Sequence, residues 1–214
     1  SYDPYYNLLE ILTHIGHSEK VFIMKRLLII LILTFSFQNL VEADDIRNIE
    51  IENMSIGDSI LDFFTKKEIK RNTVDWYNDN EYTTIEIIKN LDKYDSLQIS
   101  FLTKDSKKTI TALDGLVSYK YKIEECYKKL DEVYKKIKSI VPNLNDEGKL
   151  TYKHNGDETG ESTITDYVLE TNKNDEIQIA CYDYSKNFSN NNDNLRVGIR
   201  LIDYRNFLRN EAYK

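Results

Sequence analysis

His154 is the residue whose surroundings most resemble a catalytic group, because Asp157, Glu158 and Glu161 follow it closely. A histidine beside carboxylates can act as a general base. Hydrolases of the Ser-His-Asp kind also need a nucleophile on a tight turn, and the chain contains no G-x-S-x-G sequence. A histidine at the end of a strand, next to an acidic turn, is more often simply solvated. We therefore assign no catalytic residue.

Residues 183–194 (DYSKNFSNNNDN) could bind calcium, because oxygen-bearing side chains occur at alternate positions. These are Asp183, Ser185, Asn187, Ser189 and Asn191. A calcium loop also has glycine at its sixth position and a bidentate glutamate at its twelfth, where this chain has Phe188 and Asn194. The default interpretation is a flexible Asn/Ser loop, and calcium binding is the alternative.

The chain has two cysteines, Cys126 and Cys181. Cys126 falls on the apolar stripe of an expected helix, and Cys181 on the apolar face of an expected strand, residues 176–183. In an exported chain this pattern predicts one disulfide, and the alternative is two buried free thiols. Two cysteines and a single usable histidine are too few for tetrahedral zinc without carboxylate help. There is no glycine-rich phosphate loop either, so we expect no cofactor.

The N-terminal region has the features of a secretory signal peptide in residues 24–43. Met24 is followed by two basic residues, Lys25 and Arg26, and the eleven residues 27–37 are uncharged. Small residues at the −3 and −1 positions place the predicted cleavage between Ala43 and Asp44. A membrane anchor is the alternative, but a spanning helix needs about 20 apolar residues. The pattern therefore predicts a periplasmic protein with no membrane span after cleavage.

Residues 1–23 precede the natural start that we infer at Met24, so we interpret them as an upstream extension that is not native to the protein. They contain His14 and His17, which we do not expect to form a metal site. The whole chain has 36 acidic and 29 basic residues, a net charge of −7. Nucleic acid and anionic lipid surfaces are poor partners for such a chain.

Residues 122–141 (KIEECYKKLDEVYKKIKSIV) predict a central amphipathic helix. Its apolar residues recur at steps of three and four, and Pro142 ends it. Acidic residues precede lysines by four positions on the other face, a spacing that stabilises a helix by roughly 0.2–0.5 kcal/mol per pair. Such a stripe requires an apolar surface to pack against.

The remaining elements predict an α+β fold with the order α, βββ, α, ββββ, α. We expect an antiparallel sheet of about six to seven strands packed on the central helix, with short N- and C-terminal helices. Ser55 and Thr65 are candidate helix caps, and Asp114-Gly115 suggests a bulge. Residues 44–214 are expected to form one domain. Residues 143–148 are the expected linker and the one plausible subdomain junction.

Several segments resemble small exported proteins of AT-rich marine bacteria of the Pelagibacter type. They are IENMSIGDSILDFF, LDGLVSYK, IEECYKKLDEVYKKIK, IACYDYSK and LRVGIR. The resemblance covers essentially the whole expected mature chain and implies export, but it brings no activity with it. A looser similarity is to envelope domains of the BamE type, as a fold analogy only. Asn53 here replaces the glycine of that group, and no lipid-bearing cysteine is present.

No motif in the sequence assigns a function. The leading hypothesis is a non-catalytic binding or envelope-interaction protein, and another envelope protein is the partner class we consider. A carboxylate-dependent hydrolase acting on a glycan is one alternative, for which two acids about 5–10 Å apart in a cleft would be needed. A calcium-dependent binding module is the other.

Overall fold

The computed structural model describes residues 46–186, 188 and 192–212 of the 214-residue chain. All of them belong to one compact unit, Ala43–Lys214. The expected signal peptide, its cleavage point between Ala43 and Asp44, and the pair His14 and His17 lie outside the described residues. Within the described part of the chain, no helix is long and apolar enough to cross a membrane.

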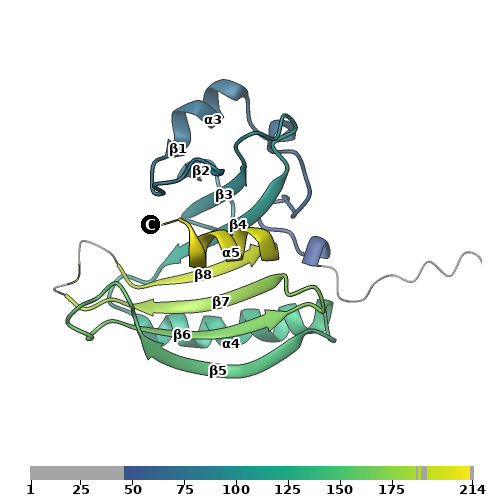
Figure 1. Cartoon of the computed structure of the whole chain (residues 1–214). Helices are drawn as coiled ribbons and strands as arrows, with labels where there is room; N and C mark the ends of the chain where they lie inside the picture. Colours follow the sequence, from purple (N-terminus) through teal and green to yellow (C-terminus); the bar gives the residue numbers. More distant parts are fainter. Residues whose placement is uncertain (1–45, 187, 189–191, 213–214) are drawn as a thin grey trace, which may run out of the picture. The chain divides into compact units, whose positions relative to one another are not determined.

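The centre of the fold is one antiparallel sheet with the strand order β1-β2-β3-β4-β8-β7-β6-β5 (Figure 1). The described strands are β1 (Thr73–Val74), β2 (Tyr82–Ile87), β3 (Ser96–Leu102), β4 (Ile110–Ser118), β5 (Asn145–Lys153), β6 (Thr163–Glu170), β7 (Glu176–Asp183) and β8 (Asn194–Arg200). The α+β class is confirmed, but the sheet has eight strands instead of six to seven. The additional strand is β1, whose two residues are too few to show an alternating pattern.

Among the described residues, three α-helices accompany the sheet, namely α3 (Lys66–Asn72), α4 (Ile123–Ile140) and α5 (Ile202–Asn210). The helix α4 is the predicted central helix, with its described ends one residue inside the predicted ones. Thr65 caps α3 through a complete capping box with Glu68, as expected. Ser55 starts no helix. Its N–H donates to the Asp58 carboxylate in a turn, and the 3-10 turn η2 (Ile60–Asp62) follows with Ser59 as its cap.

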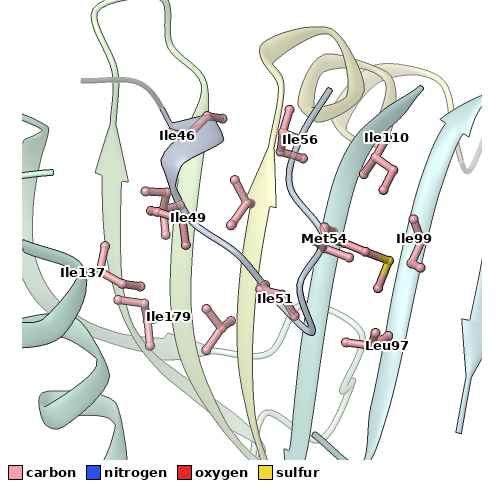
Figure 2. Close-up of a cluster of buried hydrophobic side chains, with 14 of the residues drawn as sticks. Ile46, Ile49, Ile51, Met54, Ile56, Leu97, Ile99, Ile110, Ile137 and Ile179 are labelled. Carbon is pink, nitrogen blue, oxygen red and sulfur yellow. The ribbon is translucent and has the colours of Figure 1, made fainter. Parts of the chain in front are cut away.

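The helix α4 packs on β6, β7 and β8, and this face of the sheet is apolar. The disulfide Cys126–Cys181 joins α4 to β7, with a Cα–Cα distance of 6.0 Å. The remainder of this face is covered by the N-terminal segment that begins at η1 (Ile46–Asn48). Figure 2 shows Ile46, Ile49, Ile51 and Met54 of this segment directed at the sheet. They cover the part of the apolar face that α4 does not cover.

The helix α5 lies on the opposite face of the sheet from α4 (Figure 1). Its Tyr204 and Phe207 pack against Tyr82 of β2, with ring centroids 5.1 and 4.8 Å apart. The helix begins without a side-chain cap of its own. Instead the Asp175 carboxylate accepts from the Ile202 N–H at 2.9 Å. The rest of this face carries polar side chains such as Asp166 and Gln178, together with the apolar Leu150 and Val168.

Residues 143–148, expected as a linker, contribute the first residues of β5. The polarity that suggested a linker arises because β5 is an edge strand and most of its side chains are exposed. A register shift between Asp146 and Lys149 accommodates Gly148, whose φ is +81°. The bulge expected at Asp114-Gly115 occurs elsewhere in β4. Ser100 and Phe101 of β3 pair with Ala112 and Ile110, which leaves Thr111 as the extra residue.

Candidate functional site

Five side chains form a continuous hydrogen-bonded chain across the α5 side of the sheet, and we call them the polar relay. They are Asp114 of β4, Arg200 of β8, Gln178 of β7, Asp166 of β6 and Tyr152 of β5. Arg200 donates to the Asp114 carboxylate and, at 3.0 Å, to Oε1 of Gln178. Gln178 Nε2 then donates to Oδ2 of Asp166 at 2.7 Å, and the Tyr152 hydroxyl donates to the same oxygen at 2.8 Å.

The strand register explains why these five residues meet. Asp114 and Gln178 both lie opposite Gly198, so that Arg200 is two positions out of register with each of them. In the same way Asp166 lies opposite Ala180 and Leu150, two positions from Gln178 and Tyr152. Every link of the relay therefore joins diagonal neighbours on one face of the sheet, which long side chains can span.

Gly198 provides the space for the first link of the relay. A Cβ at this position would lie 2.6 Å from Nη2 of Arg200 and would also collide with the Asp114 carboxylate. The ion pair thus occupies the volume in which any larger residue would place its side chain. This glycine is required by close packing and not by its backbone conformation.

A second set of charges comes from α5. Arg205 pairs with Glu170 of β6 and, at 3.3 Å, with Glu176 of β7. Glu176 also accepts from Arg200 at 2.9 Å, so that it connects this set to the polar relay. Nε of Arg205 is buried and has no hydrogen-bond partner among the described residues.

Most of these charged groups are buried, which makes their pairing energetically important. Asp114, Glu176 and Arg200 are 6–7% exposed, and Asp166 is 1% exposed. Burial alone lowers the pKa of Arg200, but Asp114 and Glu176 raise it above its ordinary value, so the guanidinium stays charged. Burial, followed by the hydrogen bond to Asp166, raises the pKa of Tyr152 and keeps its hydroxyl protonated as a donor.

All relay residues except Asp114 line the floor of a cleft with a volume of about 520 Å³. The side chains of Leu150, Val168 and Leu208 give it apolar walls, and Asn145, Glu147 and Arg209 are polar residues of its lining. Tyr152 is 42% exposed and Leu150 46% exposed, so the walls of the cleft present apolar surface that a ligand could contact. A cleft of this size, with apolar walls and a few oriented polar groups, is typical of sites for small molecules.

Asp166 is the one member of the relay that lacks a charged partner. Both of its hydrogen-bond donors, Gln178 and Tyr152, are neutral and bind the same oxygen, Oδ2. The other oxygen, Oδ1, accepts no hydrogen bond from any described residue, although Asp166 lines the cleft. A carboxylate this deeply buried is normally paired or fully hydrogen-bonded.

A larger hollow of about 760 Å³ lies near α3, among residues 52–54, 63–72 and 87–92. Its most buried acceptor, the Glu52 carboxylate, is already occupied by the backbone N–H groups of Asp92, Lys93 and Tyr94. These bonds fix the loop before β3. The hollow therefore has a structural explanation that the relay cleft lacks, and its greater volume does not make it the better candidate.

A third hollow lies on the relay side of the sheet, over the neighbouring strands. Trp76, Glu86, Gln98 and Arg196 contribute to its lining. The guanidinium of Arg196 lies 5.4 Å from the centre of the Tyr182 ring, and its Nε has no hydrogen-bond partner among the described residues. This hollow is shallower, about 380 Å³, and we treat it as secondary.

The structure does not arrange His154 and Asp157 as a base and its orienting acid. Nδ1 of His154 accepts from the Gly156 N–H at 3.1 Å. Asp157 accepts instead from Ser162 and Thr159, and these hydrogen bonds lower its pKa. The carboxylate thus stabilises the turn between β5 and β6, and both Glu158 and Glu161 are exposed.

Of the calcium candidates, Asp183 and Ser185 are described, and Asn187, Ser189 and Asn191 lie outside the described residues. The Ser185 hydroxyl donates to Asp157 at 3.3 Å. Burial, followed by the nearby Asp193 charge, raises the pKa of Asp183. In the described part of the chain, no group of three or more His, Cys, Asp or Glu side chains is placed to hold a metal.

Sequence reasoning did not identify the relay. Its residues come from five strands, and Asp114 and Arg200 are 86 positions apart. The available signal was the presence of Asp114, Asp166 and Arg200 inside strands whose neighbouring residues are apolar. Comparison of the chain with protein-family models, curated proteins and solved structures found no match in any of the three.

Proposed function

We propose that this protein is exported to the periplasm and binds a small molecule there without transforming it. The disulfide between Cys126 and Cys181 supports the compartment, because such bonds persist where the surroundings are oxidising. The acidic balance of the chain is consistent with a partner that is neither nucleic acid nor an anionic membrane.

The binding site in this proposal is the relay cleft, and the observation that carries it is the unpaired Oδ1 of Asp166. Oδ1 is not among the fully buried atoms without a partner, so this oxygen is accessible from the cleft. A ligand that donates to it would replace the water that solvates it. The relay holds Asp166 in place from both sides, so the acceptor is oriented before a ligand arrives.

The arrangement favours binding over glycan hydrolysis. A hydrolase of the carboxylate type needs one free acid to protonate the leaving group and a second to act as base or nucleophile. In this cleft Glu170 and Glu176 are bound by Arg205, and Glu176 also by Arg200. Asp166 is the one buried carboxylate of the lining without a charged partner among the described residues. Glu147, which also has none, is exposed, so the cleft does not enclose the two free acids that the mechanism requires.

Export can be tested by expressing the chain from Met24 in a bacterium and measuring the intact mass of the purified protein. A mass that begins at Asp44, and rises by two hydrogens on reduction, supports the periplasmic assignment. An uncut chain with two free thiols contradicts it.

Binding can be tested by measuring thermal melts of the purified protein with a panel of small amines, sugars, amino acids and organic acids. A compound that stabilises the native protein, but has at least tenfold weaker affinity for a cleft variant such as Asp166→Asn, supports the proposal. Stabilisation by none of them contradicts it. Hydrolysis of a chromogenic glycoside that is lost in Asp166→Asn would establish the enzymatic alternative, and a calcium-dependent melt would establish the calcium-binding one.

A further inference from the structure

Given that the relay cleft is the binding site, we infer that its ligand is an organic cation, an ammonium group carried on an apolar stem. The inference rests on three features of the cleft: the charge balance of its floor, the free oxygen of Asp166, and the apolar walls beside that oxygen. It rests on the proposed function and specifies the chemistry of the molecule bound.

The floor of the cleft has an excess of negative charge. Four carboxylates, those of Asp114, Asp166, Glu170 and Glu176, are connected to only two buried guanidinium groups, those of Arg200 and Arg205. Arg209 approaches Glu176 to 3.9 Å, but its side chain is 63% exposed, so it compensates little of this charge. Glu147 of the lining is exposed too, so it likewise contributes little to the balance. A cation is the ligand charge that restores the balance.

Asp166 is the point at which a cation would bind. It is 1% exposed, its two donors are uncharged, and no ion pair with a described lysine or arginine reaches it. An ammonium N–H donating to Oδ1 would form a charge-assisted hydrogen bond, about twice as strong as one from a neutral hydroxyl. The same ammonium would supply the counter-charge that the relay does not provide.

An anionic ligand does not fit, because the buried arginines are already engaged. Arg200 is bound by Asp114, Glu176 and Gln178, and Arg205 by Glu170 and Glu176. An anion would have to displace one of these carboxylates and leave it buried without a partner, which is strongly unfavourable. The free Nε of Arg205 offers a single donor and no net attraction once these pairs are counted.

The walls of the cleft determine what carries the ammonium group. Leu150, Val168 and Leu208 surround the approach to Asp166, and the Tyr152 ring stands beside the carboxylate that its hydroxyl binds. These side chains would contact an alkyl or aryl stem, and an aromatic ring next to a bound ammonium adds a favourable cation–π interaction. A small hydrated metal ion would gain nothing from such walls.

The test compares 2-phenylethylamine with 2-phenylethanol, which differ in charge while the stem stays the same. Each is titrated into ¹⁵N-labelled protein at pH 7, and dissociation constants are obtained from backbone amide shifts in β5–β7. We expect the amine to bind about tenfold more tightly than the alcohol, or better, and its affinity to fall with added NaCl. Because this comparison uses the unmodified protein, it does not depend on any variant folding.

Asp166→Asn is the informative variant. An asparagine can keep its oxygen towards Gln178 and Tyr152, while its amide NH₂ replaces Oδ1 at the cleft surface. The amine should then lose at least tenfold in affinity, with the alcohol little changed. Glu86→Gln is the matched control, since it removes one negative charge from the lining of the third hollow on the same sheet face and should leave the amine affinity within about twofold.

The outcomes separate the inference from the proposed function. Equal binding of amine and alcohol, or an amine affinity unaffected by Asp166→Asn, overturns the inference that the ligand is a cation. The proposal that the cleft binds a small molecule would still stand. Cleft binding by a neutral sugar or an organic acid in place of the amine has the same meaning. Absence of any cleft binding across the whole compound panel overturns both.

Discussion

Arg200 and Asp114 lie on neighbouring antiparallel strands, two positions out of register, and their ion pair covers the backbone of Gly198. Because Gly198 has no side chain, the two charged groups can approach each other over its backbone. This relationship fixes the first link of the relay, and it makes Gly198 a sensitive position for a conservative substitution.

We predict that Gly198→Ala destabilises the protein by about 3 kcal/mol, because the added methyl group must separate the buried Arg200–Asp114 pair and leave the Asp114 carboxylate without its counter-ion. The midpoint of urea unfolding would measure the loss. Gly156→Ala is the control, since its new Cβ meets only the His154 ring at 3.1 Å and the Phe188 ring. Equal stability of Gly198→Ala and the native protein would show that the pair does not occupy this space in solution.

Removing the disulfide should cost roughly 4 kcal/mol on the chain-entropy model, since the bond closes a loop with a sequence separation of 55 residues. The double variant Cys126→Ala/Cys181→Ala, compared with the oxidised native protein in urea, provides the measurement. Reduced native protein is the control for the small change in packing volume. If oxidised and reduced native protein unfold at the same urea concentration, the bridge makes no contribution.

The Asp157 turn predicts a specific dependence of stability on pH. Hydrogen bonds from Ser162 and Thr159 lower the pKa of Asp157 below its ordinary value of 3.8. Its contribution is therefore complete above that ordinary value and is lost as the pH falls towards the lowered one. We expect Asp157→Asn to unfold at lower urea than the native protein at pH 7, and the difference to shrink below about pH 4. A difference that stays constant between pH 7 and pH 3 would contradict this assignment.

The hydrogen bond of Tyr134 predicts how stability and tyrosine ionisation change at alkaline pH. Its hydroxyl donates to Asp146 at 2.6 Å, and this bond, followed by burial, raises its pKa to about 12. Its contribution is present below the ordinary value of 10 and is lost as the pH rises towards 12. A spectrophotometric titration should show one tyrosinate fewer near pH 12 in Tyr134→Phe. Loss of a group that ionises near pH 10 would mean that the bond to Asp146 does not form.

The elements that the sequence predicted well are those defined by local pattern. The strong 3.6-residue period and Pro142 placed α4 to within one residue, and the apolar phase of Cys126 and Cys181 correctly predicted their bridge. Local pattern failed where a segment was too short or too polar to show its period. For this reason β1 was missed, and the exposed start of β5 was interpreted as a linker.

The relay could not be predicted in this way, because its geometry depends on the order and register of five strands. Gln178 alternates with the apolar Ile177 and Ile179, and Tyr152 lies between Thr151 and Lys153, so neither position stands out in the sequence. The pairings β4–β8, β8–β7, β7–β6 and β6–β5 together make these residues a connected set. The useful clue, a charged residue inside an apolar strand, was visible in the local sequence. The partners of that residue lie on other strands, far away in the sequence.

The polar relay also affects how faithfully the chain can fold. A slip of one residue in the pairing of β8 would turn Arg200 into the apolar layer beneath α4 and expose Ile199 in its place. The same holds for Asp114 in β4 and Asp166 in β6, so each misaligned sheet buries charges without their partners. Both faces of the sheet therefore favour the native strand register: the apolar face beneath α4 and the charged face on the opposite side. The charged face thus disfavours misaligned strand pairings during folding, and this effect does not depend on which molecule binds in the cleft.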